Sequence, residues 1–340
     1  MKKVYFLFAI TLFLLPVTSC KDGARGKNML PGVTGKSGEI IIVMEKREQD
    51  SDFGKKLVEI LTEEYEILPQ VEPTFNPHPI PLSAFSDLFK HHRNIILVRV
   101  SDEYGQARML KQQDVWASPQ TIISIEGNNL DSMATYVEKH KDRLIATVEE
   151  AEIKRNIDNI KKYEDARLRE AVEKQFGISL SFPRAYELRK TPSEDFMWIS
   201  YETQIFSQGV FIYSYPYMGE NLPPQSLILK QRADFLKRNI PGPTVGSYMI
   251  ANPDIIPAYA VTKVNDMECA EVRGLWEVKG DFMGGPFISY TFYSKPNRRA
   301  VTVEAYVYVP QKPKRISLRQ VDAILRTFAW TDGHGKEDPK

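Results

Sequence analysis

Residues 209–217 read GVFIYSYPY, and this stretch decides how the longer part of the chain folds. Its aromatic residues alternate at Phe211, Tyr213, Tyr215 and Tyr217. Side chains two residues apart on a β-strand point to the same face of a sheet, so the pattern predicts a strand with one aromatic face. Such a face either covers a core beneath a helix or stacks on the sugar rings of a glycan, and both interpretations stay open here. Tyr213 and Tyr215 are therefore candidate residues of a ligand or partner surface.

Short aromatic segments of the same kind precede and follow this strand. They read ISLSFP (178–183), YELRK (186–190), FMWISYE (196–202), AYAVTKVN (258–265), CAEVRGLWEV (269–278), FISYTFYS (287–294) and AVTVEAYVYV (300–309). Helical segments are set apart from them at 225–239 and 315–328. Runs of strands with separate helices predict an α+β domain with an antiparallel sheet over 177–330. The element order is similar to the folds of the photosystem protein PsbP and the nuclear protein Mog1, an analogy of fold that implies no function.

Residues 39–141 follow a different pattern, in which β-branched runs alternate with helical segments. The runs EIIIVM (39–44), NIILVRV (94–100) and TIISIEG (121–127) are typical of strands covered on both faces. Helices are expected at 53–65, 83–92 and 128–140, whereas the proline-rich stretch 67–82 excludes a helix or a central strand. We expect a three-layer α/β unit with about three strands.

Residues 142–176 are densely charged and contain neither glycine nor proline. Apolar residues recur mostly at steps of three to five, which predicts one long amphipathic helix, or two end to end, on or between the domains. Acidic and basic side chains are interspersed, so the charged face is expected to be solvated rather than to bind nucleic acid.

The N-terminus has the features of a targeting signal. Lys2 and Lys3 precede the apolar run VYFLFAITLFLLP, which is typical of a signal peptide over residues 1–19. The sequence VTSC that follows resembles the lipobox of bacterial lipoproteins, and this resemblance implies that Cys20 becomes acylated and anchors the chain to a membrane. Residues 20–38 read as a flexible tether and 331–340 as a disordered tail. No acidic run follows Cys20, so we expect an outer-membrane lipoprotein on the periplasmic face rather than on the cell surface.

The tether contains GVTGKS (32–37), which matches the second half of a nucleotide-binding P-loop. The first glycine of that motif would fall at position 30, where the chain has Leu30. A P-loop also follows a strand and opens a helix, whereas here the strand EIIIVM comes afterwards. We therefore expect no nucleotide at this position.

The composition excludes several other classes. The chain has 45 basic and 44 acidic side chains, and loss of Lys2 and Lys3 with the leader changes the balance from +1 to −1. A neutral chain offers no general basis for binding nucleic acid or an anionic membrane surface. With Cys20 lipidated, Cys269 has no disulfide partner and is expected to be a small buried residue in a strand. The standard zinc motifs and nucleophile motifs are absent, so we predict no catalytic residues, cofactor or metal site.

RGLWEVKGDFMGGPF (273–287) is the other candidate binding stretch. Glycines beside strand residues suggest a bulge or a tight bend at which a ligand or another backbone comes close. The residues that would border a pocket there are Trp276, Phe282, Gly284, Gly285 and Phe287. The competing interpretation is a packed hairpin corner.

Several of these segments together resemble one family. DVWASPQTIISI (114–125), PGPTVGSYM (241–249), RGLWEVKGDFMGGPFISYTF (273–292) and LRQVDAILRTF (318–328) are similar to Bacteroidota lipoproteins catalogued as domain of unknown function 4837. The resemblance covers nearly all of the mature chain and implies a lipid-anchored envelope protein without a known activity. We predict a non-catalytic factor that binds a protein or an envelope component. The alternatives are an enzyme acting on cell-wall glycans and a glycan-binding module.

Overall fold

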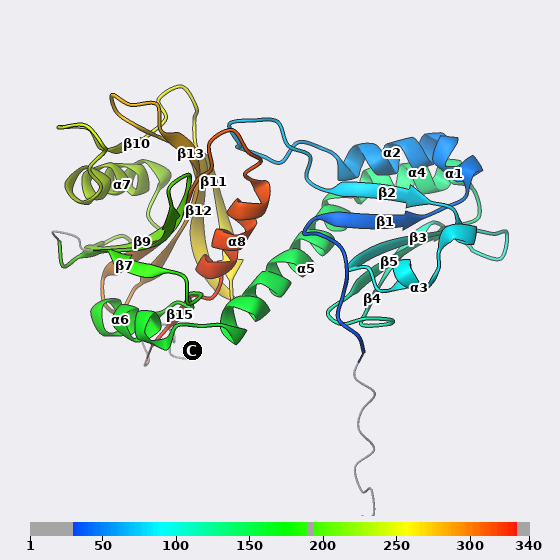
Figure 1. Ribbon diagram of the computed structural model, residues 1–340, viewed down its shortest axis with the longest axis horizontal. Coiled ribbons are helices and arrows are strands. Elements are labelled where there is room, and N and C mark those ends of the chain that lie inside the picture. Colours follow the sequence, from blue (N-terminus) through cyan, green and yellow to red (C-terminus); the bar gives the residue numbers. More distant parts are fainter. Residues whose placement is uncertain (1–29, 190–192, 332–340) are drawn as a thin grey trace, which may run out of the picture.

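The computed structural model describes residues 30–189 and 193–331 (Figure 1). The expected signal peptide, Cys20, most of the tether and nearly all of the C-terminal tail lie outside the described residues. The described chain forms an N-terminal unit and a C-terminal domain, each built on its own sheet, with the helix α5 running between them (Figure 1). This arrangement confirms the α+β class with an N-terminal α/β unit.

The N-terminal sheet has five strands in the order β2-β1-β3-β5-β4. The three predicted strands form its centre, as β1 (Glu39–Val43), β3 (Asn94–Val100) and β5 (Thr121–Gly127), which run parallel. The two edges, β2 (Asn76–Ile80) and β4 (Arg108–Gln113), were not predicted. Proline is tolerated in β2 because an edge strand pairs on one side only. The exposed strand β4 carries polar residues instead of a β-branched run.

Helices make this unit three-layered. One face is covered by α1 (Lys46–Asp50), α2 (Asp52–Leu61), α4 (Leu130–Lys139) and the start of α5 (Lys141–Lys162). The other face has a thinner cover from η1 (Leu82–Ala84), α3 (Asp87–Lys90) and Trp116. Both faces of the central strands are therefore buried, as their continuous apolar runs indicated.

The charged segment 142–176 forms two helices, which is one of the two predicted alternatives. The helix α5 ends at Lys162, and α6 (Ala166–Phe176) begins after a three-residue break. The side chain of Asp165 caps α6 by accepting a hydrogen bond from the backbone N–H of Arg167 at 3.0 Å. The cap fixes where the second helix starts.

The C-terminal domain is a curled antiparallel sheet of eight strands with helices on both faces. Its main path is β10-β12-β13-β14-β9-β8-β7, and β11 also pairs with β12. The strands are β7 (Glu187–Arg189), β8 (Phe196–Thr203), β9 (Phe206–Pro216), β10 (Met249–Ala251), β11 (Ala258–Val264), β12 (Met267–Val278), β13 (Gly284–Ser294) and β14 (Arg299–Tyr308). A separate two-stranded ladder joins β6 (Ile178–Ser179) and β15 (Ala329–Trp330).

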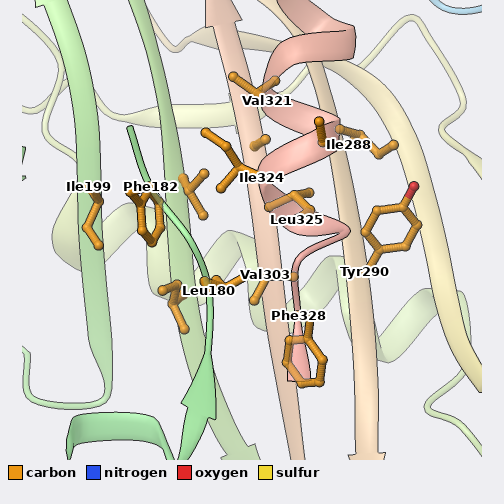
Figure 2. Packing of buried hydrophobic residues seen from close by; sticks show 14 of the residues in the cluster. Leu180, Phe182, Ile199, Ile288, Tyr290, Val303, Val321, Ile324, Leu325 and Phe328 are labelled. Atoms are coloured by element: carbon orange, nitrogen blue, oxygen red, sulfur yellow. The ribbon is translucent and has the colours of Figure 1, made fainter. Parts of the chain in front are cut away.

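Two helices fill the cores on either side of this sheet. Figure 2 shows α8 (Arg315–Leu325) packed on one face, where Ile324 and Leu325 meet Ile288 and Val303 of the sheet. On the opposite face lies α7 (Gln225–Asn239), which buries Phe235 and Leu236. The antiparallel sheet with set-apart helices is as predicted.

Buried polar contacts join the two units. Arg319 of α8 is fully buried and donates from Nε to Glu149 of α5 at 2.8 Å. Its Nη2 also donates to the carbonyl oxygen of Thr74, on the loop leading into β2, at 2.8 Å. A single side chain of the C-terminal domain is thus bonded to two segments of the N-terminal unit.

The end of the predicted tether differs from expectation. Residues 31–37 are held on the N-terminal unit: the N–H of Ser118 donates to the carbonyl oxygen of Pro31, and the N–H of Thr34 donates to that of His91, both at 2.9 Å. The Ser37 hydroxyl donates to the buried carboxylate of Glu152 at 2.9 Å. The Gly, Lys and Ser composition suggested a loose linker, but backbone pairing, which composition does not reveal, ties this part down.

Candidate functional site

The aromatic face of β9 forms core, not surface. Tyr213 is completely buried, and its ring lies 4.7 Å from that of Phe235 on α7. Tyr215 is also buried, and burial raises the pKa of its hydroxyl to about 12. The prediction that Tyr213 and Tyr215 contribute a ligand or partner surface is therefore wrong, because α7 covers them. The glycan-stacking interpretation loses its basis with them.

The glycines at 284–285 are also explained by packing. The β12–β13 ladder runs without interruption through the pair Trp276↔Gly285, so there is no bulge. A Cβ on Gly285 would lie 2.0 Å from the carbonyl oxygen of Val307, so only glycine lets these strands approach. Phe287 is buried under the guanidinium of Arg232, 3.9 Å from its ring centre. The packed corner was the correct alternative for Gly284, Gly285 and Phe287.

A cavity opens beside this corner, at the end of the sheet where β8, β12 and β14 finish. We call it the aromatic pocket. Its volume is about 270 Å³, and the main side chains on its walls are Trp198, Phe206, Met249, Trp276, Met283, Tyr306 and Tyr308. Of the five predicted residues, only Trp276 lines it. Glu202, Thr203, Gln204 and Ser207 supply the polar part of the lining.

Hydrogen bonds position the rings of the pocket. Trp198 donates from Nε1 to the hydroxyl of Tyr306 at 3.2 Å, and the hydroxyl of Ser207 lies 3.0 Å from the same oxygen. Burial raises the pKa of Tyr306 to about 12, so this hydroxyl stays protonated at physiological pH. The indole of Trp276 meets the Tyr306 ring edge-on at 5.9 Å. The walls are therefore held in fixed orientations before any ligand arrives.

One buried donor at the pocket is unused. Trp276 is almost completely buried, and its Nε1 has no hydrogen-bond partner among the described residues. A buried N–H group without an acceptor is destabilising by roughly 1–3 kcal/mol. This nitrogen is closed to solvent and lies beside Gly285, 3.2 Å from where a Cβ of that residue would be, so it is not open to the cavity. With walls of aromatic, Met and Pro side chains, the pocket suits an apolar group.

The mouth of the pocket has exposed apolar tips. Ile205 lies in the β8–β9 turn, Val245 in the α7–β10 loop and Phe282 in the β12–β13 turn. Each of these three segments also supplies lining residues of the pocket. Val245 and Phe282 are fully exposed, and Ile205 is 65 % exposed. Phe282 was predicted as a pocket residue, and it instead projects into solvent beside the pocket.

A second, more polar groove of about 630 Å³ bears on the enzyme alternative. It is lined by three carboxylates, Glu220, Asp266 and Glu268, together with Tyr293 and Trp330. The ammonium of Lys295, 2.8 Å from Glu220, lowers the pKa of that carboxyl. A general acid for glycoside hydrolysis needs the opposite shift. Across the described ranges, no cluster of three or more His, Cys, Asp or Glu side chains is arranged to hold a metal ion.

The pocket could not be found from sequence because its walls come from distant segments. Trp198 and Tyr306 are 108 positions apart and meet only through the order of the strands. The members with a readable signal were Trp276, in a motif rich in Gly and aromatic residues, and the alternating Tyr306 and Tyr308, which could extend the aromatic surface predicted on residues 209–217. Trp198 sits in FMWISYE, where nothing separates it from an ordinary core residue.

Fold and pocket together define a two-domain protein: an α/β unit followed by a curled α+β domain that contains the aromatic pocket. Residues 165–327 match the family described as Domain of unknown function (DUF4837), and the C-terminal domain belongs to it, as the sequence motifs indicated. Residues 33–161 match a separate family, Domain of unknown function (DUF8532). The DUF4837 resemblance therefore covers the C-terminal domain rather than nearly all of the mature chain.

Two solved structures are similar to this chain at the level of fold. The Saccharomyces cerevisiae Ran-binding protein Mog1p has 8 % sequence identity, a TM-score of 0.32, and coverage of 46 % of this chain and 91 % of that chain. A mutant of protein Mog1 has 8 % identity, a TM-score of 0.30, and coverage of 46 % and 92 %. Comparison with curated proteins gave no match. Within the described ranges, no helix combines the length and apolar character needed to cross a bilayer.

Proposed function

We propose that this chain is a lipid-anchored, non-catalytic protein of the cell envelope, whose C-terminal domain binds an apolar group of a partner protein or envelope component. The aromatic pocket carries this proposal. It combines oriented rings with an apolar interior, and these features belong to a binding site. The lipobox at Cys20 supports an anchored protein at the periplasmic face of the outer membrane.

The anchoring step is tested by labelling. Cells that express the chain are fed a clickable palmitate, and the Cys20→Ala variant is compared with the wild type. We expect the label to be lost in the variant, because the acylated thiol and the amine of the lipidated residue are both on Cys20. Persistent labelling of the variant would remove the anchor from the proposal.

The binding step is tested by photocrosslinking in cells. A photoreactive amino acid at Thr203, an exposed residue of the pocket lining, should capture a specific adduct. The matched control places the same probe at Val71, which is exposed on the N-terminal unit. Equal capture at both positions, or no capture at Thr203, would contradict binding at the pocket.

One observation supports the alternative function, an enzyme acting on cell-wall glycans: three carboxylates line the polar groove. Replacing Asp266 and Glu268 by Asn and Gln should abolish hydrolysis of cell-wall glycans by the purified chain if that function holds. The lowered pKa of Glu220 excludes only this carboxyl as the general acid, so loss of hydrolysis in the double variant is the deciding observation.

A further inference from the structure

The three apolar tips share one end of the C-terminal domain with two unpaired cations. We call this region the loop end: Ile205, Val245 and Phe282 with Lys237, Lys279 and Tyr248. The ammonium groups of Lys237 and Lys279 lie 5.6 and 5.8 Å from the centre of the Tyr248 ring. Neither has a carboxylate within ion-pair distance among the described residues. The loop 240–248, which carries Val245, connects α7 to β10. Figure 1 shows α7 and β10 on the side of the domain away from the N-terminal unit.

Three acidic side chains lie near these cations. Asp281 accepts the backbone N–H of Phe282 at 2.6 Å, and Glu202 accepts the hydroxyl of Ser200 at 3.0 Å. Asp195 lies 3.8 Å from the guanidinium of Arg238. Glu202 lies 3.6 Å from the guanidinium of Arg189, so Asp281 is the acid of this group that keeps an uncompensated charge. The two free ammonium groups outnumber it, which leaves a net positive charge beside the Val245 loop.

The backbone of the loop that carries Val245 also suits insertion into an apolar phase. The loop PGPTVG (241–246) has no charged side chain and two prolines, which reduces the number of backbone N–H groups left without partners. Its N–H at Gly242 donates to the carbonyl of Ser247 at 2.8 Å, so the loop is closed on itself. Exposed bulky apolar residues on separate turns, backed by Lys and Tyr, are the features of an interfacial membrane site.

We infer that the loop end seats on an anionic lipid bilayer, with Val245, Phe282 and Ile205 entering the acyl region and Lys237 and Lys279 pairing with lipid phosphates. Tyr248 then lies at the headgroup level, between the two cations. The aromatic pocket opens among the tips and faces the same lipid layer. This inference rests on the proposed function only in naming the apolar group that the pocket receives, a lipid chain.

Vesicle binding by a chain without its own lipid tests the inference. The Cys20→Ser protein without its signal peptide is sedimented with phosphatidylcholine vesicles that contain phosphatidylglycerol. We expect V245E/F282E to bind at least tenfold more weakly, because two bulky apolar groups leave the bilayer. The control V71E changes an exposed valine of the N-terminal unit and should bind as the parent does.

The charge component has its own pair of variants. K237A/K279A should bind anionic vesicles roughly 25-fold more weakly, about fivefold for each lysine. The exposed lysines of the control K111A/K174A lie elsewhere and should leave binding unchanged. With neutral vesicles, the difference between K237A/K279A and the parent should disappear.

A fluorophore reports insertion directly. In the Cys20→Ser background, F282C gives one accessible thiol, because Cys269 is buried. An environment-sensitive dye at position 282 should shift to the blue on adding anionic vesicles, and the same dye at position 71 should not. No vesicle binding, or equal binding by V245E/F282E and the parent, overturns the inference.

The two proposals fail in distinguishable ways. If Thr203 captures a protein and vesicles do not bind, the loop end is a protein-docking surface and the lipid inference is wrong. If vesicles bind through the tips while the probe at Thr203 captures neither lipid nor protein, the proposal that the aromatic pocket binds a ligand is wrong. The inference that the loop end binds a bilayer then still holds.

Discussion

The buried ion pair between Arg232 of α7 and Glu304 of β14 offers the sharpest test of how the C-terminal domain is held together. Both side chains are almost fully buried, with Nη2 of Arg232 at 2.8 Å from Oε1 of Glu304 and Nε at 3.0 Å from both carboxylate oxygens. The hydroxyl of Tyr213 adds a longer contact of 3.4 Å. Removing Arg232 leaves a carboxylate inside the core with that hydroxyl as its main remaining donor.

Arg232→Ala should lower the free energy of unfolding by about 3–5 kcal/mol at pH 7.5, since it leaves an unpaired buried charge. For a domain of this size the loss corresponds to a fall of roughly 6–20 °C in Tm. The Arg232→Met/Glu304→Leu double variant should recover most of the stability, because no charge is then left in the core. Urea unfolding followed by tryptophan fluorescence measures all three proteins.

The pH dependence identifies the mechanism. Burial raises the pKa of Glu304 in the folded protein above its unfolded value, and Arg232 opposes this rise. The folded state therefore keeps the proton to higher pH, and stability falls as the pH rises from the unfolded value through the folded pKa. Without Arg232 the folded pKa moves further up, so the deficit of Arg232→Ala should shrink between pH 7.5 and pH 5.

A matched surface change completes the test. Lys154 and Asp158 form an exposed pair at 3.0 Å on α5, and Lys154→Ala should alter stability by no more than about 0.5 kcal/mol. The reasoning is refuted if Arg232→Ala costs less than about 1 kcal/mol, or if its deficit is the same at both pH values.

Three further changes test other parts of the structure. Gly285→Ala should lower Tm by several degrees because its Cβ would overlap a backbone carbonyl of β14, whereas Gly105→Ala, with open space around it, should be neutral by the same thermal scan. Cys269, whose pKa burial raises to about 12, should react with iodoacetamide at pH 8 only after denaturation; rapid labelling of the native protein would show that the thiol is exposed. Arg319→Met removes the bond to Glu149 between the units and should speed proteolysis at their junction, and an unchanged digestion pattern would mean that other contacts suffice.

The sequence pattern predicted strands of the N-terminal unit correctly where both faces of the strand are buried. The strands β1, β3 and β5 are covered on both faces, so their apolar runs are continuous and readable. The edges β2 and β4 have no such run and were missed. The break between α5 and α6 depends on one capping side chain, Asp165, within a segment whose apolar spacing fits one helix or two.

The sequence by itself indicated two sheets of different type, the charged helical segment between them and the DUF4837 motifs. The lipobox and the location that it implies stay predictions. Only the tertiary structure decided which aromatic residues form the hydrophobic core and which line the aromatic pocket. Tyr213 is hidden by α7, and Trp198, Trp276 and Tyr306 gather at one end of the sheet. The reason is physical: the period of a strand reveals which residues share a face, but the partner strand and the covering helix are set by contacts between segments far apart in the chain.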